Sequence, residues 1–286
     1  MIHFLIFIQQ LIASGTHVVA KGITGTLAPE FVLLIRAMIA SFVYLIWILI
    51  RNRRLKKIDK KDLPYFVLLG LLNIPMNQFL FLKSISLTSP PNVALAYAMT
   101  PAFVLVIAMI FLKEQVTSKK IAGVLIAIIG AFIILLQTGL NIDSDGFKGD
   151  LTALVASFSW GLYTVIGKRI STKYGAIFTT GMAMFFGLAL YLPMFFILDI
   201  EYSFAQITSI NWVQLIYLGA ITSGVGYALW YYALTKIEAS KISVYNNLQP
   251  VLTTLLSVLF FATPITLPFI FGGLLIIAGV TITQRS

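Results

Sequence analysis

Ten long apolar runs divide this chain and leave few ways for it to fold. They cover residues 2–20, 31–50, 64–83, 91–112, 118–136, 150–168, 175–198, 211–235, 241–262 and 266–284. A helix needs about 20 apolar residues to cross a bilayer, and the runs have about that length. Hydrophobic residues make up 59% of the chain and charged residues 10%, which excludes an ordinary soluble domain. We therefore expect an all-α integral membrane protein with ten transmembrane helices.

The chain also repeats itself. Residues 92–113 (NVALAYAMTPAFVLVIAMIFLK) resemble residues 241–262 (KISVYNNLQPVLTTLLSVLFFA), and the alignment pairs Pro101 with Pro250. Each copy holds five spans. Because five is an odd number, the second copy enters the membrane from the opposite side, which makes the two copies inverted repeats. The predicted domains are a first repeat at 1–138, an external linker at 139–149 and a second repeat at 150–286.

Lysine and arginine gather in the loops that follow every second span. These loops hold 16 of the 20 basic residues, seven of them between Arg51 and Lys61. Cytoplasmic loops carry such an excess, so both termini are predicted on the cytoplasmic side of the cell inner (cytoplasmic) membrane. The formal charge of +10 therefore reflects orientation in the lipid bilayer, and we expect no nucleic-acid partner. We expect the protein to act as a monomer.

The ninth span carries amides where hydrocarbon makes them costly. Asn246, Asn247 and Gln249 lie near its middle, next to Pro250. Amides at that depth must face protein or water, because lipid offers them no hydrogen bond. The proline also removes one hydrogen bond of the helix. The span is therefore predicted to line an internal cavity, with Pro101 and Pro250 as gating or hinge positions.

Polar and aromatic residues on other spans predict further walls of this cavity. Gln10, Ser14 and His17 share one face of the first span, and Ser157 begins a stripe of the same spacing in the sixth. Trp160, at mid-span, predicts an aromatic wall for an apolar or cationic substrate. The predicted substrate-binding residues are Gln10, Ser14, His17, Asn77, Tyr97, Ser157, Trp160, Thr164, Tyr227, Trp230, Asn246, Asn247 and Gln249.

Ionisable residues are rare inside the spans. Only His17 and Arg36 lie within them, and no Asp or Glu lies near mid-span. We expect His17 to act as a neutral hydrogen-bonding group and Arg36 to reach the external surface or Glu30. Movement of substrate down its own gradient is therefore favoured over proton antiport. Tyr231 and Tyr232 are assigned to the aromatic belt at the membrane interface.

Composition also limits the chemistry of the chain. It has no cysteine and two histidines, which excludes thiolate metal sites and histidine clusters, so we expect no metal and no cofactor. An intramembrane enzyme is a remote alternative. Ser14 and His17 share a helical face, but no acidic residue or oxyanion-binding group accompanies them. We therefore expect no enzymatic activity.

Several features occur together along the whole chain. They are the two five-helix halves, Lys21 at the end of the first polar stripe, Arg36 early in the second span, the phrase FLKE at 111–114 after Pro101, and glycine-rich fifth and tenth spans. In this combination the chain resembles the drug/metabolite transporter superfamily, in particular its ten-helix members with paired EamA-type domains.

The resemblance implies a secondary transporter with spans 1, 3, 4, 6, 8 and 9 around a central cavity. Its substrate would be a small organic metabolite, either an amino acid or a drug-like molecule. The transporter would work by alternating access, as an exporter or a facilitator. A channel or lipid translocase with the same architecture stays open as an alternative.

Overall fold

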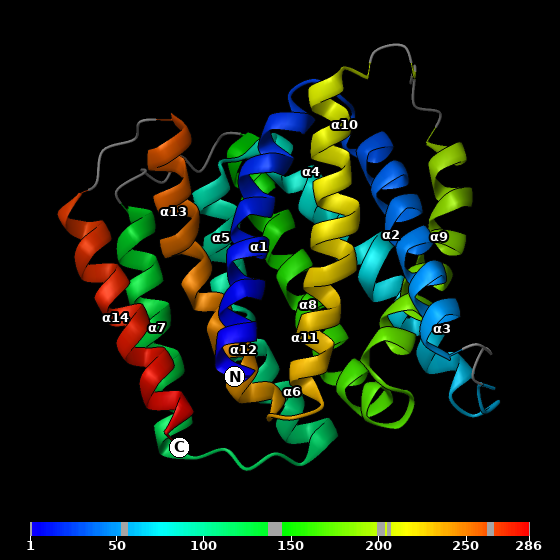
Figure 1. Ribbon diagram of the computed structural model, residues 1–286. Helices are drawn as coiled ribbons and strands as arrows, with labels where there is room; N and C mark the ends of the chain where they lie inside the picture. The colour runs from blue at the N-terminus through cyan, green and yellow to red at the C-terminus, as the bar shows by residue number, and fades with distance from the viewer. Residues whose placement is uncertain are drawn as a thin grey trace.

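The computed structural model describes residues 2–52, 57–136, 145–198, 204, 207–261 and 266–285, which form helices and no strand. These residues make ten helical segments that run roughly side by side from one end of the molecule to the other (Figure 1). The first five are α1 (Ile2–Thr24), α2 (Pro29–Asn52), α3–η1–α4 (Leu63–Leu71, Leu72–Gln78, Phe79–Leu87), α5–α6 (Pro90–Ala98, Thr100–Leu112) and α7 (Ser118–Leu136). The last five are α8 (Asp145–Tyr174), α9 (Ala176–Ile197), α10–η3–α11 (Ser209–Ile216, Tyr217–Gly226, Tyr227–Leu234), α12–η4–α13 (Ala239–Ser243, Val244–Asn247, Leu248–Phe261) and α14 (Leu267–Gln284).

Six of these segments are long and apolar enough to cross a membrane by length and composition alone. They are Ile2–Thr24, Pro29–Ile50, Leu63–Leu87, Pro90–Leu112, Ala176–Ile197 and Ser209–Leu234. Large apolar side chains such as Ile110, Ile197 and Leu259 are exposed, whereas asparagine and glutamine side chains are buried between the helices. An apolar exterior around a polar interior suits a protein whose solvent is lipid, so the chain is an integral membrane protein.

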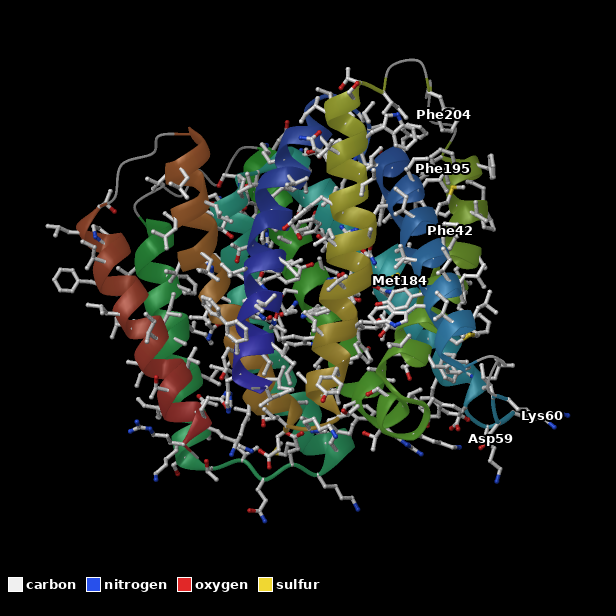
Figure 2. The ribbon with its side chains drawn as sticks, in the orientation of Figure 1. Phe42, Asp59, Lys60, Met184, Phe195 and Phe204 are labelled. Carbon is white, nitrogen blue, oxygen red and sulfur yellow. The ribbon has the colours of Figure 1, made fainter. Side chains whose placement is uncertain are left out.

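The two ends of the molecule differ in the residues they carry. Figure 1 shows both chain termini at the same end. Figure 2 places Lys60 of the basic loop at that end too, and Phe204 at the opposite end. Which side of the membrane this end faces stays a prediction.

The predicted external linker at 139–149 falls partly outside the described residues, which resume at residue 145. Residues 145–149 form the first turns of α8 and not a connecting turn. Asp145 stands at the start of this helix, where a negative charge stabilises the helix dipole. Its carboxylate also lies 3.2 Å from the ammonium group of Lys148.

The fifth segment of each half packs against the other. A Cβ atom added at Gly130 of α7 would lie 2.5 Å from the carbonyl oxygen of Gly272, and one at Gly279 of α14 would lie 2.5 Å from that of Gly123. The two backbones therefore touch and run antiparallel, which only glycine permits at these positions. Figure 1 shows α7 and α14 side by side at one edge. That the two halves are inverted repeats stays a prediction.

Four of the inner segments are interrupted near their middle. The wide turns of η1 accommodate Pro75, which cannot donate a helical hydrogen bond. η3 interrupts the eighth segment in the same way. The fourth segment breaks at Met99 before Pro101, and the ninth breaks at η4 before Pro250. Interrupted helices re-aim side chains and backbone groups toward the interior, and wide helical turns of this kind occur often at functional sites.

Candidate functional site

A central cavity lies where the interrupted helices meet. Its volume is about 50 Å³, room for a few water molecules and far below the roughly 300–1,000 Å³ of ligand pockets. A ligand of that size class therefore does not fit inside the cavity in this conformation. The cavity is lined by Gln9, Ile12, Ala13, Thr16, His17, Arg36, Asn77, Gln78, Phe81, Tyr97, Trp160, Thr222, Gly226, Tyr227 and Gln249.

Amides from α1 and from the ninth segment form a hydrogen-bonded network at one side of this cavity. Gln10 Nε2 donates to Gln9 Oε1 at 2.7 Å and to Asn246 Oδ1 at 3.2 Å. Gln249 Nε2 donates to Gln10 Oε1 at 3.0 Å and to Asn246 Oδ1 at 3.2 Å. The Gln249 oxygen then accepts from His17 Nε2, 3.0 Å away, which places a proton on that ring nitrogen. The network holds His17 and Gln249 at the cavity wall.

Aromatic rings form another part of the cavity wall, where the Tyr97 ring packs against His17 at 5.9 Å between centroids. Asn77 Nδ2 donates to the Tyr97 hydroxyl at 2.7 Å and to the carbonyl oxygen of Ala156 at 2.8 Å. The Tyr227 hydroxyl donates to Asn77 Oδ1 at 3.4 Å. The rings of Trp160 and Tyr227 lie 4.9 Å apart, centroid to centroid. Asn77 thus fixes two tyrosine hydroxyls, while Trp160 presents an apolar surface to the cavity.

Arg36 lies inside the molecule and not at its external surface. Its side chain is 2% exposed, and its Nε donates to Ser223 Oγ at 2.9 Å. Glu30 pairs instead with Lys83, at 3.1 Å, so the sequence interpretation of Arg36 is wrong. The physical reason is close packing of α2 on η3. A Cβ atom added at Gly219 would lie 3.0 Å from the Arg36 carbonyl oxygen, so the two backbones are in close contact there, and the side chain is held by Ser223 of η3.

All thirteen predicted substrate-binding residues are buried, but they fall into two groups. Whether either group binds substrate stays a prediction. Those on the cavity wall are His17, Asn77, Tyr97, Trp160, Tyr227 and Gln249. Those behind the wall are Gln10, Ser14, Ser157, Thr164, Trp230, Asn246 and Asn247. Gln10 and Asn246 support the wall through their bonds with Gln249. Behind the wall, Ser157 bonds Thr100 at 2.8 Å and Thr164 accepts from Trp230 Nε1 at 3.1 Å.

Five polar residues on the wall were not among the predicted set: Gln9, Thr16, Arg36, Gln78 and Thr222. Arg36 carried a usable signal, because an ionisable residue within a span is a functional candidate by default. Gln78 follows Asn77 directly, and only the wide turns of η1 bring both side chains inward. Thr16 and Thr222 bond each other across α1 and η3 at 2.8 Å.

Tyr231 is buried, and its assignment to the interfacial belt is wrong. Its hydroxyl donates to the carbonyl oxygen of Tyr163 at 2.8 Å. Gly167 of α8 makes room for this ring, since a Cβ atom there would overlap the Tyr231 hydroxyl. Tyr232, one residue later, is 40% exposed.

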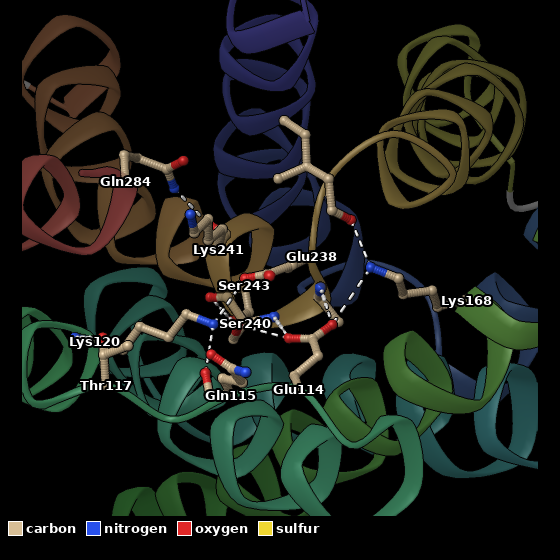
Figure 3. Close-up of polar contacts among 12 residues, drawn as sticks. Glu114, Gln115, Thr117, Lys120, Lys168, Glu238, Ser240, Lys241, Ser243 and Gln284 are labelled. Carbon is tan, nitrogen blue, oxygen red and sulfur yellow. Dashed lines mark hydrogen bonds and ion pairs between the residues drawn. The ribbon is translucent and has the colours of Figure 1, made fainter. Parts of the chain in front are cut away.

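A polar cluster joins the residues after α6 to α8 and to the start of α12 (Figure 3), near the end of the molecule that holds the termini (Figure 1). α6 ends at Leu112 and is capped by Lys113, whose left-handed backbone (φ 54°) turns the chain toward Glu114. The Glu114 carboxylate accepts from the Ala239 N–H at 2.8 Å and from the Ser240 hydroxyl at 2.6 Å. Lys168 Nζ lies 3.4 Å from the same carboxylate. We call Glu114, Lys168, Ala239 and Ser240, with the contacts between them, the closing cluster.

The closing cluster joins the two predicted halves, because Glu114 belongs to the first half and its partners to the second. Burial raises the pKa of the Glu114 carboxyl, but the bonds from Ser240 and Ala239 outweigh it and leave the pKa below its usual value. A second bridge lies beside it, where Lys120 Nζ meets Glu238 Oε2 at 2.7 Å.

The chain is similar to known transporters along nearly its whole length. It is 29% identical over 286 residues to Uncharacterized transporter YyaM of Bacillus subtilis (strain 168), with 98% of this chain and 92% of that protein covered. It is 30% identical over 262 residues to an Uncharacterized transporter of Archaeoglobus fulgidus, covering 91% and 90%. A Biotin transporter of Escherichia coli (strain K12) is 23% identical over 266 residues, covering 92% and 86%.

Two further comparisons concern the fold and the family. A solved crystal structure superposes with a TM-score of 0.80 over 99% of this chain and 96% of that chain, at 19% identity, and so shares its fold. The model of the EamA-like transporter family matches residues 1–136 and 147–284. The chain therefore belongs to the EamA-like transporter family.

Proposed function

We propose that this protein is a secondary transporter that carries a small organic metabolite across the cytoplasmic membrane by alternating access. It works as an exporter or as a facilitator, and both termini face the cytoplasm. The observation that carries the proposal is the central cavity itself. Polar and aromatic side chains gather there at the meeting point of four interrupted helices, which is where transporters built from repeats hold their substrates.

The size of the cavity favours alternating access over a channel. A channel needs a continuous water-filled path, whereas this cavity holds about 50 Å³. The closing cluster follows the last turn of α6, near the end that holds the termini, and its hydrogen bonds can break and re-form. Rocking of one half against the other would open one end of the cavity while the other end stays closed.

The composition of the wall supports a small organic substrate. Trp160, Phe81 and Tyr97 offer apolar surface, and Gln249 and Gln78 offer amides that can fix its orientation. The Biotin transporter of Escherichia coli is a relative whose name indicates a substrate of this size class.

Solute counterflow tests this function even while the substrate is unidentified. Purified protein is placed in liposomes filled with an unlabelled cell extract, and the same extract with isotopic label is added outside. We expect mass spectrometry to find labelled compounds inside, with saturable uptake that falls when the internal extract is omitted. Flux that rises in proportion to concentration and ignores the internal extract would instead identify a channel.

A further inference from the structure

Arg36 presents a buried positive charge to the central cavity. Its side chain is 2% exposed, and its Nη1 has no hydrogen-bond partner among the described residues. Its Nε donates to Ser223, and the Tyr227 hydroxyl lies against the guanidinium. A guanidinium stays protonated in proteins. A charge at membrane depth costs free energy unless an opposite charge accompanies it.

The acidic side chains that the structure describes cannot supply that opposite charge, because each has other partners. The cationic partners are Lys83 for Glu30, Lys173 for Asp59 and Asp62, Lys168 for Glu114, Lys148 for Asp145 and Lys120 for Glu238. Asp150 accepts from Thr88 and Asn92. These groups lie at the two ends of the molecule, while Arg36 lines the cavity.

We infer that the substrate itself supplies the missing negative charge, as a single carboxylate bound to Arg36. This inference rests on the proposed transport function and names its substrate class. The guanidinium fork matches a carboxylate with two parallel hydrogen bonds, and the unpartnered Nη1 is available for one of them. One guanidinium balances one negative charge, which favours a monocarboxylate over a multiply charged anion.

The rest of the cavity defines the body of this substrate. Trp160 and Phe81 line the same cavity as Arg36 and offer apolar contact. The substrate is therefore a monocarboxylate with an apolar or aromatic body. A cationic substrate is excluded, because Arg36 would repel it in a medium of low polarity.

Lys21 is a weaker candidate for the group that binds the substrate carboxylate. Its ammonium group already donates to the carbonyl oxygens of Ile85 at 3.0 Å and Thr88 at 2.9 Å. It does not line the cavity. The anion site is therefore assigned to Arg36 and not to Lys21.

Uptake from a defined mixture tests the inference. Proteoliposomes receive small carboxylates, each with its neutral carboxamide: nicotinate with nicotinamide, biotin with biotinamide, and N-acetylated amino acids with their amides. The labelled-extract assay runs in parallel. Three variants are compared with the unmodified protein: Arg36→Gln removes the charge, Arg36→Lys keeps it without the fork, and Lys148→Gln removes an exposed charge far from the cavity.

We expect the unmodified protein and Lys148→Gln to take up carboxylates and leave the matching carboxamides outside. Arg36→Gln should lose at least about thirtyfold in carboxylate uptake, the usual effect of removing one partner of a buried charge pair. Arg36→Lys should take up less but keep the preference for carboxylates. This preference is a ratio, so a general loss of folded protein does not change it.

Two results would overturn the inference, and they differ from failure of the proposed function. Uptake of the carboxamides in preference to the matching carboxylates would show that the cavity does not select an anion. An unchanged preference in Arg36→Gln would show that another group provides the selection. If neither the mixture nor the labelled extract yields any uptake, the proposed transport function fails, and this inference fails with it.

Discussion

Trp160 is the residue on which the substrate body is expected to rest. Its ring lines the cavity and packs against Tyr227. Trp160→Ala removes that surface and should lower transport by about thirtyfold, the equivalent of about 2 kcal/mol of lost apolar contact. Trp212→Ala is the matched control, because Trp212 is 42% exposed on α10. Initial uptake rates in proteoliposomes measure transport by both variants. Equal losses in the two variants would contradict a binding role for Trp160.

His17 is expected to hold a hydrogen bond and not to carry a proton across the membrane. Its Nε2 is fixed by Gln249, and no acidic side chain among the described residues faces it. His17→Gln should therefore still transport, since glutamine can also donate to Gln249. With equal substrate on both sides of proteoliposomes, an imposed pH gradient should drive no accumulation. Accumulation that disappears in His17→Gln would instead identify His17 as a proton carrier.

At the scale of single helices, the contact between α7 and α14 depends on glycine. In Gly279→Ala the new methyl group would lie 2.5 Å from the Gly123 carbonyl oxygen and 2.7 Å from the Ala127 nitrogen. Backbone cannot move away as a side chain can, so we expect a stability loss of about 1–3 kcal/mol. Gly273→Ala is the control, because its methyl group would meet Val251 at an ordinary 3.6 Å. Thermal unfolding in detergent should separate the two variants, and equal melting temperatures would contradict this packing.

The sequence could predict the elements that follow from the length of an apolar run or from the ring of a proline. Apolar length located the helices, and Pro101 and Pro250 mark breaks that the structure contains. η3 has no proline, so its wide turns carry no signal in the sequence. The positions of Arg36 and Tyr231 depend on room left by glycines of other helices. Such contacts between distant segments cannot be deduced from spacing within one segment.

At the scale of the whole molecule, the closing cluster should respond to acid. The pKa of Glu114 lies below its usual value of about 4.5 in the folded protein. Its stabilising effect is therefore complete above about pH 4.5 and is lost as the pH falls through the lower, folded-state pKa. Amide hydrogen exchange at residues 239–240, corrected for its intrinsic pH dependence, should be slow near neutral pH and accelerate in acid. Glu114→Gln should exchange fast throughout.

The capping box of α10 is the internal control for this exchange measurement. The Asn211 N–H donates to Thr208 Oγ1 at 3.3 Å, and no carboxylate takes part. The protection of the Asn211 amide against hydrogen exchange should not change over the same pH range. Protection at residues 239–240 that is insensitive to Glu114→Gln would mean that the carboxylate does not hold this end closed.

The central claim is that one cavity opens to the two sides of the membrane in turn, and thiol labelling tests it most directly. The chain has no cysteine, so Ala13→Cys introduces a single thiol on the cavity wall. A membrane-impermeant maleimide is applied to oriented vesicles from either side, with and without Glu114→Ala. We predict that Glu114→Ala speeds labelling from the cytoplasmic side and slows labelling from the external side. Labelling that rises from both sides together, or from neither, would contradict alternating access.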